Sequence, residues 1–208
     1  MTNPDAPAHP PGTIEDVFMP VDITDETTDH TGFRTVTTTS YQETKSGLKA
    51  RRELVRAPQA VAVVVYDPAL DRLVMIKQFR LGAQLALGRG FCVEVVAGLI
   101  DPGEEPGQTA IRELKEEAGL DAVRVEKLCA FLTTPGLTDE VIHLYYAQVD
   151  ASNLVSVAGV EGESEKTFPI TLTLEEALSA VDDNRILNGI AMVALLIFAR
   201  HQSRLIGK

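Results

Sequence analysis

The strongest hydrophobic pattern in this chain is an unbroken apolar run over residues 60–66, A-V-A-V-V-V-Y. A run of this length, bounded by the turn signal Asp67-Pro68, predicts a β-strand that is buried on both faces. Segments rich in β-branched and aromatic residues predict further strands at residues 34–41, 48–56, 73–79, 91–96, 123–131 and 141–148. The first two of these flank a polar turn at Ser46-Gly47, so they predict a small antiparallel unit near the N-terminus.

Helical spacing of apolar residues appears in the second half of the chain. Residues 108–118 predict a helix that Gly119 ends, and its apolar face consists of Ala110, Ile111, Leu114 and Ala118. Thr173 and Glu176 form a capping-box pattern, which predicts a helix that ends near Val181. Residues 186–205 predict a last helix, which is apolar nearly all round at its start and is therefore expected to be buried on several sides.

These elements predict an α+β fold in which strands outnumber helices. A mixed sheet with helices on both faces, an α/β/α sandwich, would bury the apolar faces, and a small N-terminal antiparallel β unit would be added to it. The sequence therefore divides into a disordered lead-in (1–15), an N-terminal β region (16–57) and a main domain (58–208).

Charge and composition exclude several classes of function. The 208 residues carry a formal net charge of -11, which argues against nucleic-acid and anionic-membrane partners because both require a basic face. The longest apolar run, residues 190–199, is too short to span a bilayer, and residues 1–12 lack the features of a signal peptide. We therefore expect a cytoplasmic protein. The two cysteines form no CxxC pair, and the four histidines show no zinc spacing.

The segment with the clearest chemistry is the Gly/Pro loop and helix from Gly98 to Leu120. Glu113, Glu116 and Glu117 stand at i, i+3 and i+4, so a helix presents them on one face, largely away from its apolar side. Clustered carboxylate oxygens without His or Cys suit Mg2+, with Mn2+ as a possible substitute, rather than zinc.

Two neighbouring residues can complete such a site. Arg112 can steer a carboxylate through a bidentate pair. The backbone carbonyl of Ala97 can supply a further oxygen, because the Gly/Pro loop allows the backbone to come close. From the residues alone, the alternative is a solvated acidic helix face, which is common in a chain this acidic.

The spacing of this segment resembles the Nudix box. That motif begins with Gly, five residues of any type, Glu and seven residues of any type. It continues with Arg-Glu, an aliphatic residue, any residue, Glu-Glu, any residue, Gly and an aliphatic residue. The matching positions are Gly98, Glu104, Arg112, Glu113, Leu114, Glu116, Glu117, Gly119 and Leu120. The resemblance implies a hydrolase in which Glu113, Glu116 and Glu117 bind divalent metal ions between the substrate phosphates. Within this set, Glu116 and Arg112 are also the catalytic candidates.

Within that family, the chain resembles the ADP-ribose pyrophosphatase group from about Phe33 to Leu205. The resemblance is carried by E-V-V-A-G-L-I-D, by the helix start N-G-I-A-M-V-A-L and by Pro135 in the loop after the box. It implies that Glu140, later in that loop, is the general base that takes a proton from the attacking water. The alternative is a surface Asp139-Glu140 pair that ends a loop.

The same resemblance implies a set of substrate-binding residues. Arg52 and Arg80 match positions that contact the phosphates or the nucleotide, and arginine is suited to bidentate phosphate contact. Glu94 matches a position near the substrate, and Pro135 and Gly136 belong to the loop that approaches it. The alternatives are exposed or structurally paired side chains for the three charged residues, and ordinary turn residues for the other two.

Three functional hypotheses follow from these observations. The first is Mg2+-dependent hydrolysis of the diphosphate linkage of ADP-ribose to AMP and ribose 5-phosphate. The second is hydrolysis of GDP-mannose or another nucleoside diphosphate sugar. The third, from a different class, is a non-catalytic Nudix-like domain that binds a nucleotide, although such domains typically lose box carboxylates that are all present here. The resemblance also implies a homodimer with exchanged N-terminal strands, in which residues 16–57 take part.

Overall fold

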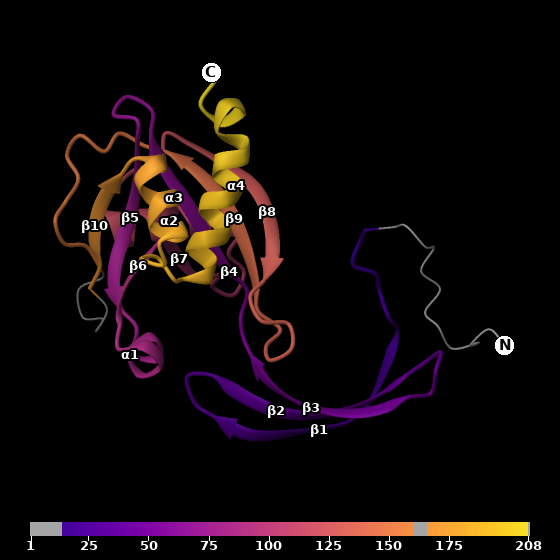
Figure 1. Cartoon of the computed structure of the whole chain (residues 1–208). Helices are drawn as coiled ribbons and strands as arrows, with labels where there is room; N and C mark the ends of the chain where they lie inside the picture. The colour runs from indigo at the N-terminus through magenta and orange to yellow at the C-terminus, as the bar shows by residue number, and fades with distance from the viewer. Residues whose placement is uncertain (1–13, 160–165, 208) are drawn as a thin grey trace. The chain divides into compact units, whose positions relative to one another are not determined.

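The computed structural model of the chain describes residues 14–159 and 166–207 (Figure 1). The lead-in predicted at residues 1–15 lies almost entirely outside the described residues. The chain divides into two compact units, one that ends at Ala57 and also includes Thr134–Asp139, and one that contains Pro58–Thr133 and the chain from Glu140 onward. No helix in the described ranges is long and apolar enough to cross a membrane.

The N-terminal unit is a three-stranded antiparallel sheet with the order β1-β2-β3. Its strands are β1 (Val21–Thr31), β2 (Thr35–Glu43) and β3 (Lys49–Arg56). Every residue of β1 is exposed, so no alternation of apolar and polar positions predicts this strand. Within the unit, Arg56 forms ion pairs with Glu26 at 3.1 Å and with Asp139 at 2.7 Å. Arg56 thus joins the outer strand and the 134–139 loop to β3.

The second unit is built on a mixed seven-stranded sheet with the order β10-β5-β4-β9-β8, to which β6 and β7 are added by pairing with β5 and β4. β4 runs parallel to β9 and antiparallel to its other partners. The strands are β4 (Ala60–Asp67), β5 (Arg72–Phe79), β6 (Phe91–Glu94), β7 (Val96–Leu99), β8 (Arg124–Leu132), β9 (Val141–Gln148) and β10 (Phe168–Leu172).

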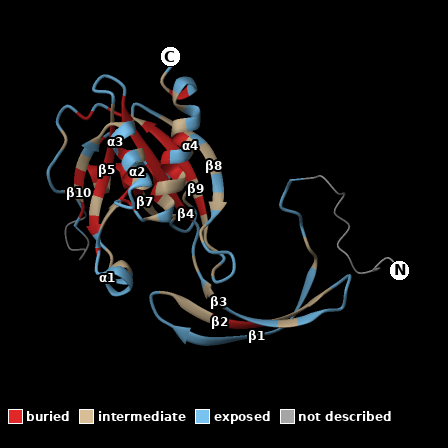
Figure 2. Cartoon of the chain, viewed as in Figure 1, coloured by how far each residue is buried: buried red, intermediate tan, exposed pale blue. Residues whose placement is uncertain are grey.

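The central strand β4 separates two hydrophobic clusters, because its side chains alternate between the faces of the sheet. The odd-numbered residues from 61 to 65 pack with α2 (Pro106–Ala118) on one face. The even-numbered residues from 60 to 66 pack with α3 (Leu174–Asp182) and α4 (Gly189–Leu205) on the other. Figure 2 shows the resulting burial of the sheet between its helices. The predicted α+β sandwich with a mixed sheet is confirmed.

Several local predictions differ from the structure. Residues 91–96 form parts of two strands rather than one, because β6 pairs with β5 while β7 pairs with β4. The expected burial of Ile111 is wrong, since 41% of its surface is exposed. The hydrophobic pattern also misses β10 and α1 (Leu81–Leu87), a short helix that buries none of its residues. The capping box of Thr173 and Glu176 is present as predicted.

Candidate active site

β7 leads the chain into the loop before α2, and its glycine lies directly against that helix. A Cβ atom at Gly98 would overlap the carboxylate of Glu113, so only glycine allows this close approach. The preceding residue, Ala97, pairs with Ala62 of β4 and donates its N–H to Glu117 Oε2 at 2.9 Å. The junction of β7 and α2 therefore positions two of the three box glutamates, the name used below for Glu113, Glu116 and Glu117.

Arg112 is the centre of a polar cluster on α2. Its guanidinium donates to Glu113 Oε1 at 2.7 Å, to Glu116 Oε2 at 3.0 Å and to Glu104 Oε2 at 3.0 Å. It also donates to the carbonyl of Leu99 at 3.1 Å, which ties the helix to the end of β7. The bond from Arg112 lowers the pKa of Glu104 to about 2, and the bond to Glu104 raises the pKa of Arg112. Arg112 therefore orients carboxylates and stays protonated.

Burial raises the pKa values of two box glutamates, Glu113 and Glu117. Glu113 is only 8% exposed, and burial raises its pKa although Arg112 opposes this shift. Burial also raises the pKa of Glu117, to about 8. Glu113 is therefore not on an open face of the helix, because its carboxylate is packed against the backbone of Gly98.

The donor chemistry of this cluster fits a hard divalent cation. The side chains offer carboxylate oxygens, and the raised pKa values of Glu113 and Glu117 show that burial disfavours their charged forms when no cation is bound. Among the described residues, no group of three or more His, Cys, Asp or Glu side chains is placed so that it could hold a metal ion. Arg112 pairs with one carboxylate oxygen of Glu113 and one of Glu116.

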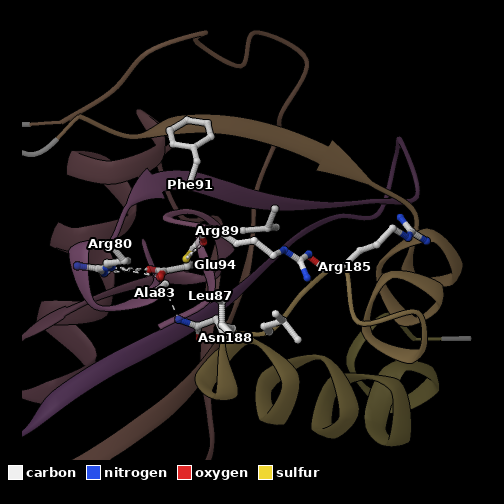
Figure 3. Close-up of a pocket in the computed structure, with 11 residues that line it drawn as sticks. Arg80, Ala83, Leu87, Arg89, Phe91, Glu94, Arg185 and Asn188 are labelled. Atoms are coloured by element: carbon white, nitrogen blue, oxygen red, sulfur yellow. Dashed lines mark hydrogen bonds and ion pairs between the residues drawn. The ribbon is translucent and has the colours of Figure 1, made fainter. Parts of the chain in front are cut away.

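A second polar cluster surrounds Glu94, the last residue of β6. This buried carboxylate accepts from Arg80 Nη2 at 2.9 Å and from Asn188 Nδ2 at 3.0 Å. It also accepts from Gln78 Nε2 at 3.0 Å. Figure 3 shows Arg80 and Asn188 pointing toward Glu94. These three residues line a cavity of about 250 Å3. No box glutamate lines this cavity, but Glu117 interacts electrostatically with both Arg80 and Glu94, so the two clusters are neighbours.

The other predicted site residues are Glu140 in the second unit and three residues of the N-terminal unit. Thr133 Oγ1 donates to Glu140 Oε2 at 2.8 Å, which fixes this carboxylate just before β9. Arg52, Pro135 and Gly136 belong to the N-terminal unit, where Arg52 donates to the preceding backbone carbonyl at 2.8 Å. Their contacts with substrate, the base role of Glu140 and the metal role of the box glutamates stay predictions.

Sequence reasoning misses three residues that support these clusters. Gln78 and Asn188 hold Glu94, and Thr167 donates its hydroxyl to the carbonyl of Glu117 at 2.7 Å. Asn188 carries a recognisable signal, because an Asn directly before an apolar helical pattern marks an N-cap. Gln78 and Thr167 carry no such signal, since their contacts join residues from different elements.

Comparison with known proteins identifies the class that this fold and site define. The NUDIX domain model matches residues 56–187, and the chain belongs to the Nudix family. The predicted Nudix hydrolase assignment is therefore confirmed.

Individual relatives narrow this class. The chain is 38% identical over 153 residues to the methanol dehydrogenase activator of Bacillus methanolicus, covering 74% of this chain and 78% of the relative. It is 36% identical over 144 residues to an ADP-ribose pyrophosphatase of Bacillus subtilis (strain 168), covering 69% and 74%. It is 30% identical over 152 residues to a GDP-mannose pyrophosphatase of Klebsiella pneumoniae, covering 72% and 75%.

One solved structure shares the fold. It is described as an ADP compounds hydrolase, and its TM-score to this chain is 0.71 at 23% sequence identity. The likeness covers 93% of this chain and 99% of that one. The predicted resemblance to the ADP-ribose pyrophosphatase group is confirmed by the sequence relatives, and the fold by this structure.

Proposed function

We propose that this chain hydrolyses the diphosphate linkage of ADP-ribose with Mg2+ and releases AMP and ribose 5-phosphate. The observation that carries the proposal is the α2 cluster, in which Arg112 holds Glu113 and Glu116 while the half-buried Glu117 lies one turn from Glu113 on the same helix. One arginine cannot neutralise so many carboxylates. An anionic diphosphate can approach this cluster once divalent cations compensate the negative charge.

Each residue of the cluster has a part in this reaction. The box glutamates and the carbonyl of Ala97 would hold Mg2+, or Mn2+ in its place, and a bound cation supplies polarisation of the diphosphate phosphorus. Arg112 keeps the carboxylates of the helix oriented. Glu140 takes the proton of the attacking water, and its bond from Thr133 sets the direction of the carboxylate.

The substrate is held by residues outside the α2 cluster. Arg80 and Arg52 bind its phosphates, because the planar guanidinium matches two phosphate oxygens at once. Pro135 and Gly136 shape the loop that approaches the substrate. Glu94 lies against Arg80 rather than in open solvent, which supports the placement of that arginine.

The proposal is tested by the products formed from ADP-ribose and Mg2+, separated by liquid chromatography. The wild type is expected to give equal amounts of AMP and ribose 5-phosphate. Glu117→Gln keeps the size of the side chain and removes its charge, so kcat should fall by at least about 100-fold. The matched control is Glu175→Gln, an exposed residue of α3, which should keep the wild-type kcat. No AMP from the wild type, or equal rates for wild type and Glu117→Gln, would contradict the proposal.

GDP-mannose or another nucleoside diphosphate sugar is the second candidate substrate. The similarity to the Klebsiella pneumoniae GDP-mannose pyrophosphatase favours it. Competition between ADP-ribose and GDP-mannose at equal concentration separates the two candidates. A higher kcat/KM for GDP-mannose would replace the first assignment with the second.

The N-terminal sheet supports a further part of the proposal, a homodimer with exchanged N-terminal strands. In this assignment residues 16–57 form the dimerisation region and residues 58–208 the Nudix domain. Large apolar residues on this part of the chain are open to solvent, with Phe18 90%, Ile23 58% and Phe33 88% exposed. Light scattering should give twice the 22.5 kDa mass of one chain, and a monomer mass would contradict the dimer. The cytoplasmic location stays a prediction.

A further inference from the structure

The cluster around Glu94 gives a role to two residues that lie outside the Nudix box. We propose that Gln78 and Asn188 are positioning residues, which fix Glu94 and through it hold the guanidinium of Arg80 ready for the substrate diphosphate. This inference rests on the proposed hydrolysis of a nucleoside diphosphate derivative. It concerns how Arg80 is placed, and it is independent of which residues bind the cation.

The hydrogen bonds of Glu94 show that this carboxylate holds the guanidinium of Arg80. Its Oε1 accepts from Arg80 Nε at 3.1 Å and from Asn188 Nδ2 at 3.0 Å. Its Oε2 accepts from Arg80 Nη2 at 2.9 Å and from Gln78 Nε2 at 3.0 Å. A carboxylate offers about four acceptor positions, so these donors fill its capacity. Glu94 is therefore a support for Arg80 and not a direct contact of the substrate.

The side chains of this cluster differ in exposure: the supporting residues are buried, and Arg80 is partly open to solvent. Gln78 is 3% and Glu94 4% exposed, whereas the side chain of Arg80 is 41% exposed. The inner residues hold one side of the arginine fork, and the fork lines the cavity of about 250 Å3. An arginine fixed in this way loses little rotamer freedom when it binds an anion, so its affinity for phosphate is higher.

Asn188 connects this cluster to the last helix. Its Oδ1 accepts the N–H of Ala191 at 2.9 Å as the N-cap of α4, while its Nδ2 donates to Glu94. A single side chain thus fixes both the start of the helix and the carboxylate that supports Arg80. Serine is also an effective N-cap, but its side chain is too short to reach Glu94. Asn188→Ser therefore separates the two roles.

The test compares the wild type, Asn188→Ser, Arg80→Ala and the double variant by steady-state kinetics with ADP-ribose and Mg2+. Asn188→Ser should raise KM by about tenfold, as expected for loss of a hydrogen bond to a charged group, and leave kcat within about twofold. Its Tm should stay within about 2 °C of the wild type because the cap is kept. In the Arg80→Ala background, the same substitution should leave KM unchanged, because its effect passes through Arg80.

Two outcomes would overturn the inference: an unchanged KM for Asn188→Ser, whether or not its Tm falls, or an equal rise of KM in the Arg80→Ala background. Failure of the proposed hydrolysis is recognised separately, because the wild type itself would then release no AMP. In that case the affinity of the four proteins for ADP-ribose, measured by titration calorimetry in EDTA, decides the inference. The same tenfold loss, absent from the Arg80→Ala background, supports it, and any other pattern overturns it.

Discussion

Two arginines of the same unit, Arg112 and Arg80, bind carboxylates in clusters of different composition. Arg112 lies among the box glutamates and Glu104, so negative charge exceeds positive charge around it. Arg80 forms an ion pair with the buried carboxylate of Glu94, which also accepts hydrogen bonds from the neutral side chains of Gln78 and Asn188. The excess of carboxylates suits the first cluster to cations, and the fully hydrogen-bonded Glu94 suits the second to a fixed scaffold.

The largest effect is expected where backbone and carboxylate meet in the first cluster. Gly98→Ala places a methyl group inside the Glu113 carboxylate, so this side chain must move. A displacement of about 1 Å in a catalytic group can cost about 100-fold in rate, and kcat/KM should fall by about that factor. Gly82→Ala is the matched control, because a Cβ atom there has nothing within 4 Å. An active Gly98→Ala enzyme would show that Glu113 is not essential in this position.

A smaller effect, of a different kind, is expected in the second cluster. Glu94→Gln removes the charge that holds Arg80, so KM should rise by about tenfold while kcat stays within about twofold. Steady-state kinetics of Glu94→Gln and Glu117→Gln, measured under the same conditions, provides the comparison, since Glu117→Gln should lower kcat instead of raising KM. If Glu94→Gln loses kcat to the same extent as Glu117→Gln, the two clusters have the same role and the contrast between them is wrong.

The smallest effect is on stability and depends on pH. Burial raises the pKa of Glu117 from 4.5 to about 8, so between these values the folded protein binds a proton that the unfolded chain releases. Stability of the metal-free protein should therefore fall as pH rises from about 5 to 8. Calorimetry in EDTA should show a Tm decline at least about 2 °C smaller for Glu117→Gln than for the wild type. Equal declines would mean that Glu117 is ionised at low pH in the folded protein.

The sequence predicts those parts of the molecule whose pattern is local. The valine run of β4 needs burial on both faces wherever it is placed, and the glycine and glutamates of the box follow a fixed spacing. β10 is missed because Pro169 argues against a strand. Among the described strands β10 pairs with β5 alone and lies at the edge of the sheet, where proline is tolerated. The apolar but exposed α1 is missed because seven residues are too few to show helical periodicity.

The candidate site also has a part that the sequence predicts and a part that it does not. Arg112 and the box glutamates lie within one short segment, so their spacing alone places them together. The partners of Glu94 come from β5 and from the start of α4, and residue spacing carries no information on contacts between such distant elements. The burial of Glu113 is missed for a similar reason, because it depends on the approach of Gly98 from a neighbouring strand.

Binding of Mn2+ tests the central claim that the cluster of box glutamates around Arg112 takes divalent cations and the cluster around Glu94 does not. Free Mn2+ is measured by electron paramagnetic resonance as the wild type, Glu117→Gln and Glu94→Gln are titrated. We predict that Glu94→Gln binds Mn2+ as the wild type does and that Glu117→Gln binds it at least about tenfold more weakly. Full Mn2+ affinity in Glu117→Gln, with loss of affinity in Glu94→Gln, would contradict the account.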